Sequence, residues 1–324
     1  MILYLLRHYP PSLLQHLRQM QRLTEQDLQI QDLTKGTIDT YRYALKFFSA
    51  FIKEKGYTLL SVDKNILREY IQYLRKNKFM QKTIENQFST FSSFYDYVVY
   101  EEWTETNIVK DIRRRYLKTY KDNGNKGGQR KLDSIEEMSR FINSILDIRD
   151  RAIALLLAKS GIRRRELIAI DLDDINWNEM SILLKPTHKR SNRVVFFDYE
   201  CAIILKRWLQ KREHHVSPEN QALFVPYTKR TQRLKRSGVG NRFVKWATIA
   251  GLHNSQSDRL EDRFTPQCAR HWNCTVLRRA GMPREFIQWL RGDAITDAMD
   301  IYYHIDPDDV RKSYLACIPQ LGIE

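Results

Sequence analysis

Apolar residues recur every three or four positions along residues 34–120, which is the spacing of one face of an amphipathic helix. The pattern predicts three long helices, "TKGTIDTYRYALKFFSAFIKEKG", "SVDKNILREYIQYLRKN" and "MQKTIENQFSTFSSFYDYVVYEEW", and then a short, basic one, "NIVKDIRRRYLKTY". The inward-facing positions are expected to be Ile38, Tyr41, Leu45, Phe48, Phe51 or Ile52, Ile66, Tyr70, Ile71, Leu74, Ile84, Phe88, Phe91, and Tyr95 with Val98. Four helices with short connections predict a helical domain of their own.

The segments on either side of this domain have no such regularity. Residues 1–33 are amphipathic but interrupted by Pro10 and Pro11, so we expect an N-terminal arm or an extra helix there. Residues 121–131, "KDNGNKGGQRK", are rich in Gly, Asn and Lys and have no periodicity, which is typical of a linker. A second domain is therefore expected over residues 132–324.

The second domain is also predicted to be mainly helical. "DIRDRAIALLLAKSG" indicates a strongly apolar helix that ends at Gly161. "MSILLKP" and "RVVFFD" are short β-rich runs on either side of the polar turn "THKRSN", which predicts a hairpin of a small antiparallel sheet. From "YECAIILKRWLQKRE" onward the chain again has helical spacing. The predicted fold class is therefore mainly α with a small antiparallel β-sheet.

The charge of the chain narrows the classes of partner and function that fit it. The chain has a formal net charge of +15, which favours a polyanionic partner and, most often, nucleic acid. A charged fraction of 29% argues against a membrane protein, and "MILYLL" is too short to span a bilayer, so we expect an intracellular, cytoplasmic protein. The four cysteines form no CxxC pair, so neither a zinc site nor any other metal site is expected.

Three short stretches carry a resemblance to a known family. "SGIRRREL", "FTPQCARHWNC" and "IYYHID" resemble, in this order, the three boxes of the tyrosine recombinase (phage integrase) family, with a hairpin lysine between the first two. The resemblance is to Xer- and Cre-like enzymes and covers residues 34–312. Within it, "ARHWNCTVLRRAGMPREFIQWLRGD" is similar to archaeal element-borne integrases. It implies a helical SAM-like core-binding domain, a catalytic domain, double-stranded DNA as partner and a homo-tetramer on paired sites.

The reaction that this resemblance implies is site-specific recombination through a 3′-phosphotyrosyl intermediate, with no cofactor. Tyr302 is the expected nucleophile, in the Tyr-x-His pattern with His304, and Tyr303 is its rival. Because tyrosine has a pKa of about 10, ionising it at pH 7 costs roughly 4 kcal/mol, which the site must supply. Arg163 and Arg270 suit this task, since each guanidinium presents a fork of donors to two phosphoryl oxygens.

The resemblance also assigns the supporting roles. Glu166 corresponds to the acidic residue that orients the site, and Lys189 in the hairpin turn is the expected general acid, with Lys185 as the alternative. Gln267 and Asp293 stand where the family usually has histidines. Gln267 can still donate a hydrogen bond, but a carboxylate at 293 repels a phosphate unless it accepts the tyrosine proton or pairs with an arginine such as Arg291.

Several points stay open at this level. His271 is expected to be buried in its helix with a structural hydrogen bond, and Cys268, Trp272 and Cys274 are expected to pack. The basic stretches Arg113–Lys121 and Thr228–Gly238 are expected to contact DNA phosphates. The C-terminal segment, amphipathic at Val310, Tyr314, Leu315 and Ile318, docks either on a neighbouring subunit or on its own domain.

Two other functions fit the same residues. One is a DNA-binding accessory protein of this fold whose site has decayed. The other is a type IB topoisomerase-like enzyme, which shares the chemistry but relaxes DNA without joining two sites.

Overall fold

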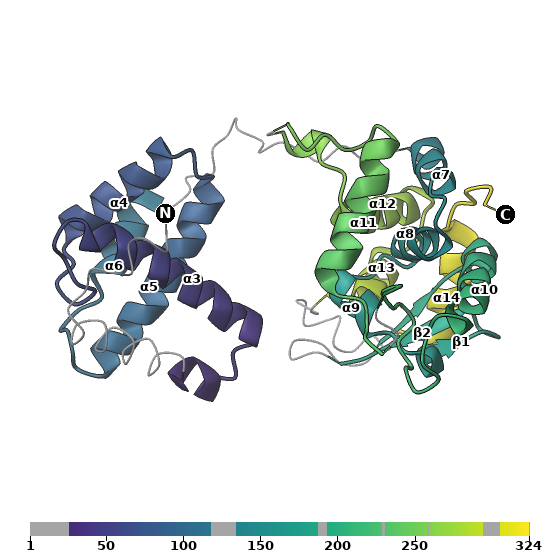
Figure 1. The fold of residues 1–324 in the computed structure, drawn as a ribbon, viewed down its shortest axis with the longest axis horizontal. Helices are drawn as coiled ribbons and strands as arrows, with labels where there is room; N and C mark the ends of the chain where they lie inside the picture. Colours follow the sequence, from purple (N-terminus) through teal and green to yellow (C-terminus); the bar gives the residue numbers. More distant parts are fainter. Residues whose placement is uncertain are drawn as a thin grey trace. The chain divides into compact units, whose positions relative to one another are not determined.

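The computed structural model describes residues 26–117, 134–186, 193–228, 231–257, 259–293 and 305–323. The chain divides into two compact units, Met1–Asn125 and Lys126–Glu324, which we call unit 1 and unit 2 (Figure 1). Tyr302, Tyr303 and His304, as well as Lys189 in the hairpin turn, lie outside the described residues. No helix in the described part of the chain is long and apolar enough to cross a membrane.

Unit 1 contains the four predicted helical segments. They are α3 (Lys35–Lys53), α4 (Lys64–Lys76), α5 (Gln81–Tyr100) and α6 (Ile108–Ile112), and α6 continues into a π-helical turn, Arg113–Leu117. The side chains of Thr34 and Asp63 accept hydrogen bonds from main-chain N–H groups at the starts of α3 and α4, which is why those helices begin there.

The core of unit 1 is apolar and aromatic. Phe48 and Phe91 stack with ring centroids 4.6 Å apart, and Tyr70 packs edge-on against Phe48 at 4.8 Å. The phenol of Tyr70 donates to Gln87 at 2.6 Å, so burial leaves no unmet hydrogen-bonding group on this ring. The buried positions of α3, α4 and α5 include all those expected from the sequence except Tyr41 and Phe51, which are partly exposed.

Unit 2 is built around one almost wholly buried helix, α8, which packs against α7, α10, α11 and α12 (Figure 1). Its described helices are α7 (Ile135–Asn143), α8 (Ile148–Ser160), α9 (Arg164–Ala169), α10 (Tyr199–Glu213), α11 (Arg236–Ile249), α12 (Pro266–Arg279), α13 (Arg284–Arg291) and α14 (Pro307–Cys317). The apolar helix predicted to end at Gly161 is therefore confirmed, with Gly161 as its C-cap.

A small antiparallel sheet in the order β1-β2-β3 lies in unit 2. Its strands are β1 (Ile175–Asn176), β2 (Ser181–Leu184) and β3 (Arg193–Phe196), with Ser181 opposite Phe196 and Leu184 opposite Arg193. The predicted hairpin is thus present, and the register brings Arg193 to the β3 end nearest the turn.

The C-terminal segment packs on its own domain. Val310, Tyr314 and Ile318 are buried, and the phenol of Tyr314 donates to the main-chain oxygen of Lys159 at 3.0 Å. Leu315 was expected to face inward but is 37% exposed. The buried positions follow a spacing of four residues, and a helix turns by about 100° between one residue and the next, so Leu315 leaves the apolar face.

Candidate active site

Arg163 and Arg270 come from different parts of unit 2. Arg163 is the residue before α9, directly after the turn that ends α8, and Arg270 lies in the first half of α12. The turn requires a φ of +62° at Gly161, which glycine adopts without strain. Glycine also leaves room for Asn273, because a Cβ at this position would lie 2.5 Å from the Asn273 side chain. Asn273 in turn donates to the main-chain oxygens of Ala158 and Lys159, which satisfies buried carbonyl groups at the end of α8.

The two arginines converge on one acceptor. Arg163 Nη1 and Arg270 Nη2 donate to the main-chain oxygen of Arg291, at 3.2 and 3.1 Å. Arg270 also donates through Nη1 to the oxygen of Gly161 at 2.5 Å. Arg270 is only 3% exposed, whereas the Arg163 side chain is 34% exposed. One guanidinium is therefore fixed in the interior, and the other lies at the surface beside it.

Asp293 lies against these two arginines and Arg291. The shortest distance is 2.7 Å, between Arg291 Nε and Asp293 Oδ2, while Oδ1 lies 3.7 Å from Arg163 and 4.0 Å from Arg270. The alternative in which Asp293 pairs with Arg291 is the one found in the structure. The pairing offsets part of the repulsion between this carboxylate and an approaching phosphate.

Glu166 is buried and joins the site to the sheet. One carboxylate oxygen accepts the main-chain N–H of Arg163 at 2.6 Å, and the other lies 3.5 Å from Arg163 Nη1 and 2.9 Å from Arg193 Nη2. Arg193 also donates through Nε to the oxygen of Leu290 at 3.0 Å. Glu166 thus bridges Arg163 and Arg193 and fixes the main chain at Arg163.

Sequence reasoning did not assign a role to Arg193 or Asn273. Asn273 follows Arg270 by three residues on the same helix, so helical spacing could have indicated that it faces the same way. In the sequence, only one feature could have indicated a role for Arg193, namely its charge at the start of an apolar strand. Its contacts to Glu166 and Leu290 come from segments that are distant in the sequence.

The site is strongly cationic. It brings together Arg163, Arg193, Arg270 and Arg291 with two carboxylates, Glu166 and Asp293, which leaves an excess of two positive charges. Burial lowers the pKa of Arg270, and Arg291 and Arg193 lower it further, while Cys274 and Glu166 act in the opposite direction. Since a guanidinium loses its proton only far above neutral pH, Arg270 stays charged at neutral pH. An arrangement of this kind has the charge and the donors to bind a phosphoryl group.

Comparisons with known proteins identify the family to which this chain belongs. Residues 131–308, more than half of the chain, match the model of the phage integrase family, and residues 15–119 match the phage integrase SAM-like domain. The chain belongs to the phage integrase family. This confirms the family resemblance, the helical fold with its SAM-like domain, and an enzyme of the site-specific tyrosine recombinase class.

Two relatives of this integrase-family chain are similar over most of its length. It is 24% identical over 295 residues to the tyrosine recombinase XerC of Leptospira interrogans, covering 88% of each chain. It is 27% identical over 284 residues to XerC of Psychromonas ingrahamii, covering 87% of this chain and 90% of that one. A solved structure of the Tn1549 transposon integrase with transposon right end DNA has the same fold, with a TM-score of 0.65, 18% identity and coverage of 90% and 97%.

Three further residues considered from the sequence, Gln267, Lys185 and His271, each have different surroundings in the structure. Gln267 is exposed at the start of α12, three residues before Arg270. Lys185, the alternative general acid, pairs with Asp171 and lies 3.5 Å from Asp174. His271 was expected to be buried, but it is exposed, because α12 buries the neighbouring residues Arg270 and Trp272 on its inner side.

Proposed function

We propose that this enzyme cuts and rejoins duplex DNA through a 3′-phosphotyrosyl intermediate, with Tyr302 as the nucleophile. In the forward step the phenol of Tyr302 gives up its proton to solvent, its oxygen bonds to phosphorus, and the bond from phosphorus to the 5′-oxygen breaks. Lys189 protonates the leaving 5′-oxygen. Religation is the reverse, so the energy of the phosphodiester is kept in the protein–DNA bond and no cofactor is required.

The observation that carries the proposal is the meeting of Arg163 and Arg270 at the Arg291 carbonyl. Two guanidinium groups so placed can bind different non-bridging oxygens of one phosphate and stabilise the charge of the transition state. Glu166 would hold Arg163 in this position. Gln267 would donate a hydrogen bond to the phosphoryl group, and Asp293, paired with Arg291, would keep the local charge in balance.

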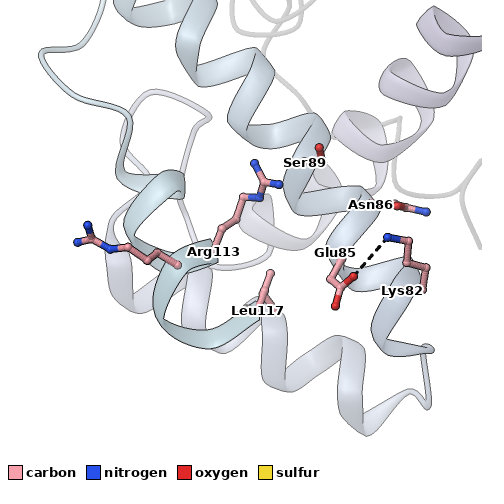
Figure 2. A pocket seen from close by; sticks show the side chains of 7 residues that line it. Lys82, Glu85, Asn86, Ser89, Arg113 and Leu117 are labelled. Carbon is pink, nitrogen blue, oxygen red and sulfur yellow. Dashed lines mark ion pairs between the residues drawn. The ribbon is translucent and has the colours of Figure 1, made fainter. Parts of the chain in front are cut away.

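Unit 1 offers a second basic surface that fits duplex DNA. A hollow of about 530 Å³ lies between α5 and the π-helical turn and is lined by Lys82, Asn86, Ser89, Arg113 and Arg114, among others. In Figure 2 the Arg113 side chain extends towards α5 near Ser89, while Lys82 pairs with Glu85. This agrees with the expected phosphate contacts from Arg113 and Arg114. In the other basic stretch, Arg233 instead binds Asp171 and the main-chain oxygens of Ile168 and Ile170.

The domain roles and assembly belong to the same proposal. Residues 34–120 would be the core-binding domain, 121–131 the linker and 132–324 the catalytic domain, with 1–33 as an arm or extra helix. The protein would act in the cytoplasm as a homo-tetramer on two paired DNA sites. The Tn1549 integrase structure was solved with DNA, which supports DNA as the partner.

Covalent trapping tests the proposal. The bound sequence is first selected from a pool of randomised duplexes, and nicked versions of it, from which the short cleaved strand diffuses away, are then incubated with the protein. A denaturing gel should show a protein–DNA adduct with the wild type and with Tyr303→Phe, and none with Tyr302→Phe.

The other outcomes separate the alternatives. Tight binding without any adduct would favour the decayed binding protein, and loss of the adduct in Tyr303→Phe alone would move the nucleophile to Tyr303. Relaxation of supercoiled plasmid that lacks the selected site would favour the topoisomerase-like enzyme.

A further inference from the structure

Unit 2 also has a cationic hollow. It lies beside the cluster of Arg163, Arg193, Arg270 and Arg291, which we call the arginine site. It has a volume of about 770 Å³ and lies between the start of α9, the middle of α11 and the start of α12. Arg164, Asn241, Lys245, Thr265 and Gln267 line it, and no acidic residue is among the described residues that do so. Arg164 directly follows Arg163 in the chain, so the hollow and the arginine site share one stretch of backbone.

Gly240 of α11 makes room for the Arg164 guanidinium. A Cβ built on Gly240 would lie 2.7 Å from Arg164 Nη1, which is closer than a Cβ atom comes to a non-bonded atom. Glycine inside a helix costs about 1 kcal/mol relative to alanine, and Gly240 is not among the glycines with a positive φ. Glycine at this position thus leaves space that the end of the Arg164 side chain occupies.

Arg164 lies in a positively charged environment. Within the part of the chain that the structure describes, no carboxylate lies within ion-pair distance of it. Partial burial lowers the pKa of its guanidinium, and nearby Arg236 lowers it further, though not to neutrality. A cation held against a helix beside another cation gains most from an anion that enters the hollow.

The other lining groups suit a phosphodiester. Asn241 and Lys245 are four residues apart on α11 and both are exposed, so they face the hollow from one side of that helix. Gln267 lines it from the start of α12. Apart from Gln267, which the proposed function assigns to the cut phosphate, the hollow offers a guanidinium, an ammonium and the amide of Asn241, all of which can donate to phosphate oxygens.

We infer that this hollow binds a backbone phosphate of the DNA other than the one that is cut, with Arg164 as the main contact and Gly240 as the residue that positions it. The inference depends on the proposed function only in taking DNA as the ligand. It predicts an effect on DNA affinity and none on the chemical step, because Arg164 would not touch the reacting phosphate.

Paired variants test it. Arg164→Gln and Arg165→Gln remove the same charge from adjacent exposed positions, but only Arg164 lines the hollow. Binding to the selected duplex is measured by fluorescence anisotropy between about 50 and 200 mM salt. Arg164→Gln should weaken binding about tenfold and reduce the slope of log Kd against log salt by about one, with a smaller change for Arg165→Gln. Equal changes in the two variants would overturn the inference.

Gly240→Ala tests the positioning role without changing the charge. It should weaken binding by displacing Arg164, and it should have no additional effect in the Arg164→Gln background. Gly238→Ala, in the same helix but facing Leu234, is the matched control and should bind as the wild type does. Wild-type affinity of Gly240→Ala would show that Arg164 does not need this position.

A scan with neutral methylphosphonates identifies the phosphate itself. Each backbone position near the cleavage point is neutralised in turn, and at one uncut position the wild type should lose affinity while Arg164→Gln loses none. At saturating DNA the cleavage rate of Arg164→Gln should equal that of the wild type. If the wild type forms no adduct but this pattern of binding persists, the proposed chemistry fails and the phosphate site stands.

Discussion

The two units are both mainly helical, but they differ in what they bury. In the described part of unit 1 the buried polar groups are neutral: those of Thr90 and Ser92 and the phenols of Tyr70 and Tyr95. Each ion pair described there, such as Lys64 with Asp111, has at least one exposed side chain. Unit 2 buries charged side chains throughout its interior: Arg149, Asp150, Lys159, Glu166, Asp198, Glu200, Arg212 and Arg270. The core of unit 1 therefore packs without buried charges, whereas unit 2 carries charges whose positions must be fixed.

One of these buried networks centres on Lys159. Lys159 is fully buried in the last turn of α8, and its ammonium donates to Asp198 at 2.5 Å, to Glu200 at 2.6 Å and to the oxygen of Pro319 at 2.7 Å. The Glu200 carboxylate also accepts the main-chain N–H groups of Leu321 and Ile323. These bonds hold the end of the chain against α8 and α10. The same helix, α8, leads into the turn before Arg163, so the network anchors an element that positions the site.

Breaking this network should have the largest effect on stability. Lys159→Met keeps most of the side-chain volume but leaves Asp198 and Glu200 buried without their cation. Removing one partner of a buried ion pair typically costs about 3–5 kcal/mol. All but Trp103 of the six tryptophans lie in unit 2, so tryptophan fluorescence in a urea titration reports mainly on unit 2. A midpoint equal to that of the wild type would show that the network does not stabilise the fold.

Acid should affect unit 2 through the same residues, with a smaller effect. Burial raises the pKa of Glu200, but Lys159 and the N–H groups of Ile323 and Leu321 outweigh it, so its pKa lies below the ordinary value of 4.5. A carboxyl whose pKa is lower in the folded state stabilises the fold above its unfolded pKa, and this contribution is lost as the pH falls through the folded pKa. The segment around Leu321 and Ile323 should therefore loosen below about pH 4.5.

Hydrogen exchange read by mass spectrometry measures this loss. Protection factors at Leu321 and Ile323 should fall with acid in the wild type, and Glu200→Gln should show lower protection at neutral pH with a weaker dependence on pH. Peptides from the core of unit 1 should keep their protection over the same range, because no buried carboxylate lies among its described residues. Parallel loss in both units would remove the contrast between them.

The same contrast explains which features the sequence could predict. Helical periodicity was sufficient for unit 1, because its core consists of apolar residues that repeat on each helix. The hairpin and the pairing of Arg163 with Arg270 followed from short motifs. Lys159 had no such signal, since its carboxylate partners lie 39 and 41 residues away and nothing in "ALLLAKSG" indicates that the lysine is buried. Contacts between charges distant in the sequence depend on the tertiary fold, as the contacts of Arg193 also do.

The smallest effect is expected at a surface pair of unit 1. Lys64 Nζ lies 2.9 Å from Asp111 Oδ2, but both side chains are about half exposed, at 54% and 52%. Water and salt screen such a pair, and ordering two long side chains offsets much of the attraction. Lys64→Met is the same substitution as Lys159→Met, and it should leave the protection of unit 1 peptides in hydrogen exchange unchanged within error. A loss of protection comparable to that caused by Lys159→Met would mean that exposed ion pairs also stabilise unit 1. The difference between the units would then be one of degree. No loss would instead show that burial, rather than the distance between the charges, decides what an ion pair contributes in this protein.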